Sequence, residues 1–315
     1  MALELGSLSP KWGPSRTARW GGGQDFSSEL GAFQASRGAG AIADLSPDLR
    51  SSSERTCFSG AMKQILNLSF AACGFLGTYH LGAASAFHRH GQLLLQAVQA
   101  FAGASGGSLV ASVLLTAPEK IEDCSRFAYQ FAEETRRHTL GALTPGFDFM
   151  ARLRGGLESI LPPDAHTQAH GRLHVSLTSA RTGRNALVCS FASREDLIQV
   201  LLASSFVPLY AGLRPVEYQG QTWVDGGLSN SLPVLPAGRT VTISPFCGRP
   251  DVCPRDGGPQ GIHLAVANQH VQLSAANLVR LSQALFPPAR PDMEALHQRG
   301  FEDAVGFLRQ EGWFQ

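Results

Sequence analysis

From Met62 onward, short apolar segments alternate with longer amphipathic segments, and this alternation constrains the fold more than any other feature of the sequence. Residues 65–72 (ILNLSFAA) have the length and composition of a buried strand, and residues 78–91 after them have a helical pattern that ends at Gly91. The same order recurs in residues 96–104 and 108–117. Strands that alternate with helices predict a three-layer α/β/α sandwich around a mainly parallel central sheet.

The rest of the chain continues this alternation, with one hairpin and a different C-terminal part. A hairpin is predicted to turn at Gln219–Gly220, and the last fifty residues have mostly helical patterns, interrupted at FPPARP. Further strands are predicted at 172–180, 185–191 and 239–245, and further helices at 118–138, 148–161 and 193–205.

Composition divides the chain and excludes several classes of function. Residues 1–61 are rich in Gly and Ser and lack periodicity, which predicts a disordered extension. After it, the patterns described above predict an α/β domain at 62–250 and a mostly helical region at 251–315. The net charge of +1 gives no basic surface for nucleic acid. The six cysteines show no zinc-binding spacing. No metal or organic cofactor is therefore expected.

The N-terminal residues carry the sequence features that indicate subcellular location. They lack the long apolar segment of a secretory signal, and we expect an intracellular, cytoplasmic protein. Arg16, Arg19 and several serines are features of a mitochondrial transit peptide, whereas Glu4 and Asp25 are not.

One serine lies between glycines at the junction of a predicted strand and a predicted helix. The sequence Gly103-Ala104-Ser105-Gly106-Gly107 matches the G-x-S-x-G nucleophile elbow, in which a sharp, strained turn requires small neighbours. The backbone N–H of Gly106 would then lie at a helix N-terminus, where it can stabilise an oxyanion. The alternative is a glycine-rich bend that only lets the helix pack closely on the strand.

A second glycine-containing loop follows the first predicted strand. Gly74, Phe75, Leu76 and Gly77 lie between that strand and the next helix, where backbone N–H groups can turn toward a common point. This position predicts the second half of an oxyanion hole. An ordinary strand-to-helix turn would use the same glycines.

The proton acceptor for Ser105 is predicted to be a carboxylate. Asp225 ends the hairpin strand and is followed by Gly226 and Gly227, which let another loop approach it closely; a plain Asp-Gly turn is the simpler alternative. Burial could raise the pKa of an aspartate and make it a stronger base. A Ser–Asp–His triad would instead need a late histidine. His263 lies in an apolar segment, and His270 and His297 lie in segments with helical patterns, so all three are expected to be structural or surface residues.

Together the segments CGFLG, GASGG and DGG resemble the patatin-like phospholipase family, in the family's order and over about residues 64 to 245. The resemblance implies a patatin-like catalytic domain with a Ser105–Asp225 dyad, supported by Gly103, Gly107, Gly226 and Gly227. It also implies esterase activity on triacylglycerol, retinyl ester or phospholipid, with possible transacylation. A transient partner would be a lipid droplet or membrane surface. The alternatives are a lipid-surface scaffold with little turnover and a hydrolase with a full triad.

Overall fold

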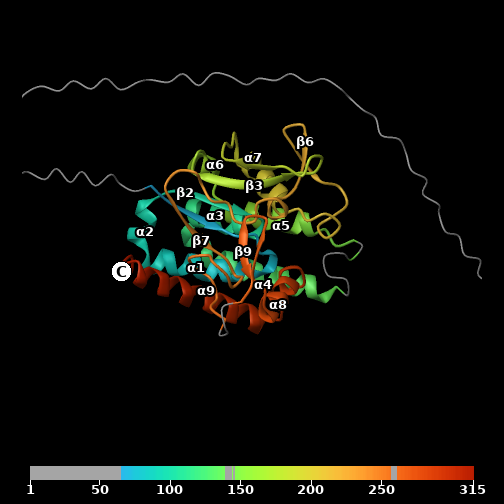
Figure 1. The fold of residues 1–315 in the computed structure, drawn as a ribbon. Coiled ribbons are helices and arrows are strands. Elements are labelled where there is room, and N and C mark those ends of the chain that lie inside the picture. Colours follow the sequence, from blue (N-terminus) through green and yellow to red (C-terminus); the bar gives the residue numbers. More distant parts are fainter. Residues whose placement is uncertain (1–64, 139–143, 145, 257–260) are drawn as a thin grey trace, which may run out of the picture. The chain divides into compact units, whose positions relative to one another are not determined.

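The computed structural model describes residues 65–138, 144, 146–256 and 261–315 (Figure 1). The extension predicted at 1–61 lies outside these residues. The strands are β1 (Leu66–Phe70), β2 (Val98–Ala104), β3 (Leu173–Ser179), β4 (Asn185–Val188), β5 (Val216–Tyr218), β6 (Gln221–Asp225), β7 (Arg239–Ile243), β8 (His263–Val266) and β9 (Gln269–Gln272).

Helices follow β1, β2, β4 and β9, as the alternating pattern predicts for the first two strands. They are α1 (Gly77–His90), α2 (Gln92–Ala97), α3 (Gly106–Thr116), α4 (Ile121–Arg137), α5 (Phe149–Ile160), α6 (Ala165–Ala169), α7 (Arg194–Ser204), α8 (Ala275–Leu285) and α9 (Arg290–Gln310), with short 3-10 turns η1 (Gly74–Leu76), η2 (Pro118–Lys120) and η4 (Gly226–Leu228). Within the described residues, no helix is both long enough and apolar enough to cross a membrane.

The central sheet has a parallel part and an antiparallel edge. Its strand order is β5-β6-β3-β2-β1-β7, and β4 pairs with β3 beside this path. The strands β7, β1, β2 and β3 are parallel, whereas β4 and β6 are antiparallel to β3 and β5 is antiparallel to β6. The predicted α/β fold, with a mainly parallel central sheet flanked by helices, is confirmed.

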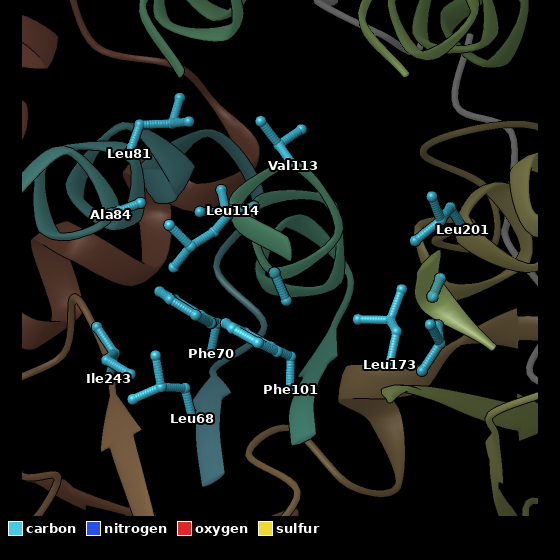
Figure 2. Packing of buried hydrophobic residues seen from close by; sticks show 14 of the residues in the cluster. Leu68, Phe70, Leu81, Ala84, Phe101, Val113, Leu114, Leu173, Leu201 and Ile243 are labelled. Carbon is cyan, nitrogen blue, oxygen red and sulfur yellow. The ribbon is translucent and has the colours of Figure 1, made fainter. Parts of the chain in front are cut away.

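The core lies between this sheet and the helices that follow its strands. Leu68 and Phe70 of β1 and Phe101 of β2 face Ala84 of α1 and Leu114 of α3 (Figure 2). All five residues of β1 are buried, because both faces of this strand are covered. A strand buried on both faces reads as a continuous apolar segment, which explains the pattern at 65–72.

The C-terminal residues pack against both the first helix and the glycine loop. In Figure 1, α9 runs beside α1, and glycines on both helices allow a close approach: a Cβ on Gly82 would lie 1.9 Å from the carbonyl oxygen of His297. Helix α8 packs against η1. The helical prediction for His270 is wrong, because this residue lies in β9, whose antiparallel pairing with β8 forms a separate two-stranded sheet.

Candidate active site

The ends of two strands meet along one edge of β3. Ala104, the last residue of β2, pairs with Ser176, and Asp225, the last residue of β6, pairs with the next residue, Leu177. Strand β4 pairs with both Ser176 and Leu177 and therefore occupies the opposite edge. Since β2 is parallel and β6 antiparallel to β3, their carboxyl ends point toward each other. This register brings Ser105 and Asp225 together.

Ser105 occupies a strained turn between β2 and α3. Its backbone has φ 52° and ψ −133°, in a region where residues with a side chain are rare. The N–H of Ser105 donates to Oγ of Ser204 over 2.9 Å, and that hydroxyl donates to the carbonyl of Ser176 over 2.8 Å. The side chain of Ser204 therefore holds the elbow against β3 at the point where the strand ladder ends.

The glycines of the elbow are required by close approach. A Cβ on Gly107 would lie 2.3 Å from the carbonyl oxygen of Phe70, and one on Gly103 would lie 2.7 Å from the carbonyl carbon of Gly107. No side chain fits at such distances. The small residues around Ser105 thus allow α3 to start directly against β1 and β2.

Asp225 is buried beside Ser105. Asp225 is only 4% exposed, and its Oδ1 accepts a hydrogen bond of 2.7 Å from the N–H of Gly227. Burial raises the pKa of Asp225 from 3.8 to about 6, and hydrogen bonds from Ser105 and Gly227 limit that rise. Gly226 has no room for a side chain, because a Cβ there would lie 1.9 Å from the carbonyl oxygen of Ser176. A carboxylate with this pKa is a stronger base than an exposed aspartate.

The glycine loop contributes fewer free donors than the sequence predicts. The N–H of Leu76 donates to the carbonyl of Cys73 over 3.0 Å, and the N–H of Gly77 donates to the carbonyl of Gly74. These bonds form because the loop closes at once into a 3-10 turn and then α1. Leu76 and Gly77 are therefore corrected from oxyanion donors to structural residues of the turn.

The remaining predicted donors lie beside the serine. Within the part of the chain that the structure describes, the N–H groups of Gly74, Phe75 and Gly106 donate to no protein acceptor. Gly74 has φ +52°, and a Cβ built on Gly106 would lie 3.7 Å from the Gly74 nitrogen. The two loops thus place unpaired backbone N–H groups on either side of one small space next to Ser105.

An apolar pocket opens at Ser105 and extends between helices. Of the helices that line it, three contribute the longest stripes: α3 with Leu109, Val110 and Val113, α4 with Cys124, Phe127, Ala128 and Phe131, and α5 with Phe149, Leu153, Gly156, Leu157 and Ile160. Gly74, Phe75, Ser105 and Gly106 line the end of the pocket at the serine. The aromatic rings of Phe75, Phe131 and Phe149 pack on one another there. A pocket of this composition suits a hydrocarbon chain whose polar end lies at the serine.

The histidines of the alternative triad lie elsewhere. All ten histidines of the chain fall within the described residues, and none of their hydrogen bonds goes to Ser105 or Asp225. His263 and His270 lie on the β8–β9 hairpin, and His297 lies on α9 against α1. Among the described residues there is also no group of three His, Cys, Asp or Glu side chains that could hold a metal ion.

The chain is similar to known proteins over most of its length. Residues 68–237 match the model of the family described as patatin-like phospholipase. A human protein, patatin-like phospholipase domain-containing protein 4, is 67% identical over 254 residues, which cover 81% of this chain and 100% of that protein. Rat patatin-like phospholipase domain-containing protein 2 is 40% identical over 78% of this chain and 51% of its own length. A mouse 1-acylglycerol-3-phosphate O-acyltransferase is 36% identical over 78% of this chain and 59% of its own length. This chain is a member of the patatin-like phospholipase family, an enzyme of the serine lipase and esterase type.

Proposed function

We propose that this chain hydrolyses acyl esters of lipids, with Ser105 as nucleophile and Asp225 as general base and acid. The observation that carries the proposal is the meeting of β2 and β6 on β3, which sets Ser105 and a buried Asp225 side by side at one end of an apolar pocket. The strained backbone of Ser105 supports the same conclusion, because such strain gathers at functional sites.

The reaction follows from the geometry. The Ser105 hydroxyl attacks the ester carbonyl carbon while Asp225 accepts its proton, and the N–H groups of Gly74, Phe75 and Gly106 stabilise the developing oxyanion. Collapse of the tetrahedral intermediate breaks the ester C–O bond, and Asp225 returns the proton to the leaving alcohol. Water then attacks the acyl-serine, with Asp225 again moving the proton, and releases the fatty acid.

The substrates proposed are triacylglycerol, retinyl ester or phospholipid, which share a long acyl chain and a carbonyl that can reach Ser105. A second alcohol in place of water would turn hydrolysis into acyl transfer. The similarity to a protein named as a 1-acylglycerol-3-phosphate O-acyltransferase supports this second outcome at the same site.

A lipid droplet or membrane surface is the proposed partner. Tyr210 and Leu285 line the pocket and are joined by a hydrogen bond from the tyrosine hydroxyl to the leucine carbonyl. Within three residues of them in sequence, Leu209, Leu213 and Phe286 are exposed by 72%, 83% and 55%. Large apolar side chains in water beside an apolar pocket favour contact with lipid. We therefore propose a cytoplasmic enzyme that binds lipid surfaces transiently; a mitochondrial location remains the alternative.

Replacement of Ser105 tests the proposal. In the Ser105→Ala variant, hydrolysis of emulsified triacylglycerol and of retinyl ester is expected to fall to background, while the unfolding transition stays close to that of the wild type. A fluorophosphonate probe should label the wild-type chain and not the variant. A wild-type chain that binds lipid but neither reacts with the probe nor releases fatty acid would instead be a scaffold.

A further inference from the structure

Two adjacent glycines in α5 differ in their surroundings. A Cβ on Gly155 would meet no heavy atom within 4 Å, whereas a Cβ on Gly156 would lie 2.3 Å from Cζ of Phe127 and within 2.7 Å of its two Cε atoms. Glycine inside a helix costs about 1 kcal/mol relative to alanine. At Gly156 this cost has a structural reason, because the tip of the Phe127 ring occupies the space of the missing side chain.

The ring of Phe127 also packs against Arg152, which lies one turn before Gly156 in the same helix. The guanidinium of Arg152 lies 4.7 Å from the ring centroid, and Arg152 forms two hydrogen bonds, of 2.7 and 3.0 Å, with the carboxylate of Glu134. The ring is therefore held by Arg152 over its face and by the backbone of Gly156 at its tip. A side chain at 156 would have to displace its tip.

Phe127 and Gly156 lie partway along the pocket. Phe75 lies at the serine end of the pocket and packs against Phe131 and Phe149. Phe127 contacts Phe131 and lies one helical turn before it in α4, which is farther from the serine. Beyond them the pocket continues to Cys124 on α4 and Ile160 on α5. At about 1.5 Å of rise per residue, Gly156 is about 10 Å along α5 from Phe149, and Ile160 is about 6 Å further.

We propose that Gly156 determines the length of acyl chain that this enzyme accepts, because its missing side chain lets Phe127 leave the deep end of the pocket open. The inference rests on the proposed esterase function. A hydrocarbon chain of C–C bonds of about 1.5 Å advances about 1.25 Å per bond. The final 6 Å of the pocket therefore holds about five carbons. Each methylene buried there can raise kcat/KM by up to about fourfold.

The test compares Gly156→Ala with Gly155→Ala on chromogenic esters from butanoate to hexadecanoate. Both substitutions add the same methyl group to the same helix, and only the first reaches Phe127. The Gly156→Ala variant is expected to retain activity on butanoate and to lose the gain from the last four or five carbons, so that its preferred chain is shorter. The Gly155→Ala variant should keep the wild-type profile.

Removing the ring should reverse the effect. The double variant Gly156→Ala/Phe127→Leu is expected to regain activity on long chains, which a general loss of stability would not produce. If Gly156→Ala does not fold, Val113→Phe adds bulk to the pocket lining from α3, about two helical turns beyond Ser105, and should shorten the preferred chain. An unchanged or longer preference in a folded variant would overturn the proposal. A wild type inactive on every ester would refute the esterase function instead.

Discussion

Asp225 is expected to destabilise the folded protein at neutral pH, and Asp225→Asn should therefore make it more stable while removing activity. Burial raises the pKa of Asp225 from 3.8 to about 6, so the folded chain holds its proton more tightly than the unfolded chain does. Near pH 3 the carboxyl is protonated in both states, and folding then has no cost from burying a charged carboxylate. This free-energy cost grows as pH rises from about 4 to 6 and reaches its full value above that.

The magnitude follows from the two pKa values. At about 1.4 kcal/mol per pKa unit, the rise from 3.8 to about 6 corresponds to about 3 kcal/mol of folding free energy at pH 8. Asparagine keeps the size of the side chain and can still accept the hydrogen bond from Gly227 through its amide oxygen. The variant is therefore expected to gain up to about 3 kcal/mol, or roughly 5 to 10 °C in Tm for a domain of this size.

The assay is urea unfolding followed by circular dichroism at pH 8 and at pH 4. The matched control is Glu217→Gln, which removes a negative charge from an exposed position in β5. Asp225→Asn should be more stable than the wild type at pH 8, with little difference at pH 4, and Glu217→Gln should change neither value by much. Equal stability of Asp225→Asn and wild type at pH 8, or an equal gain at both pH values, would refute the reasoning.

Two further predictions concern the same site. If Asp225 is the base, kcat/KM for a soluble ester should rise about tenfold per pH unit below pH 6 and level off above it, because only the deprotonated carboxylate accepts the serine proton. A pH profile of kcat/KM that is flat from pH 4.5 to 7 would contradict this. Ser204→Ala removes the partner of the Ser105 N–H and of the Ser176 carbonyl, both buried, and should cost about 1 to 3 kcal/mol of stability and lower kcat. The control Ser125→Ala removes a buried hydroxyl in α4 that bonds only within its helix, so an equal loss of kcat in both variants would argue against a role of Ser204 at the elbow.

The sequence predicts the local parts of the site and not their assembly. The elbow at Ser105 and the hairpin ending at Asp225 are visible because steric demands on neighbouring residues leave a glycine pattern. Their meeting depends on the pairing of Ala104 with Ser176 and of Asp225 with Leu177, and no local pattern specifies a register between strands so far apart in the chain.

Other features were missed for related reasons. Ser204 is one of two adjacent serines at the end of a helix, and nothing in the sequence distinguishes its bond to Ser105. The sequence likewise does not indicate the proposed role of Gly156, because its partner Phe127 comes from another helix. Glycine spacing predicts Leu76 and Gly77 as donors because it indicates a turn without indicating which N–H groups the turn itself uses. The sequence around His270 predicts a helix because a short polar strand at the protein surface has little periodicity.

The end-to-end meeting of β2 and β6 has a consequence for folding. Neither the strand–elbow–helix unit nor the hairpin contains both residues of the proposed dyad, and each brings one of them to β3. Under the proposed mechanism, hydrolytic competence can therefore arise only after both have docked on that strand in the correct alignment. A partly folded chain that has formed every local element would still be inert, which keeps an activated serine from reacting before the pocket around it is assembled.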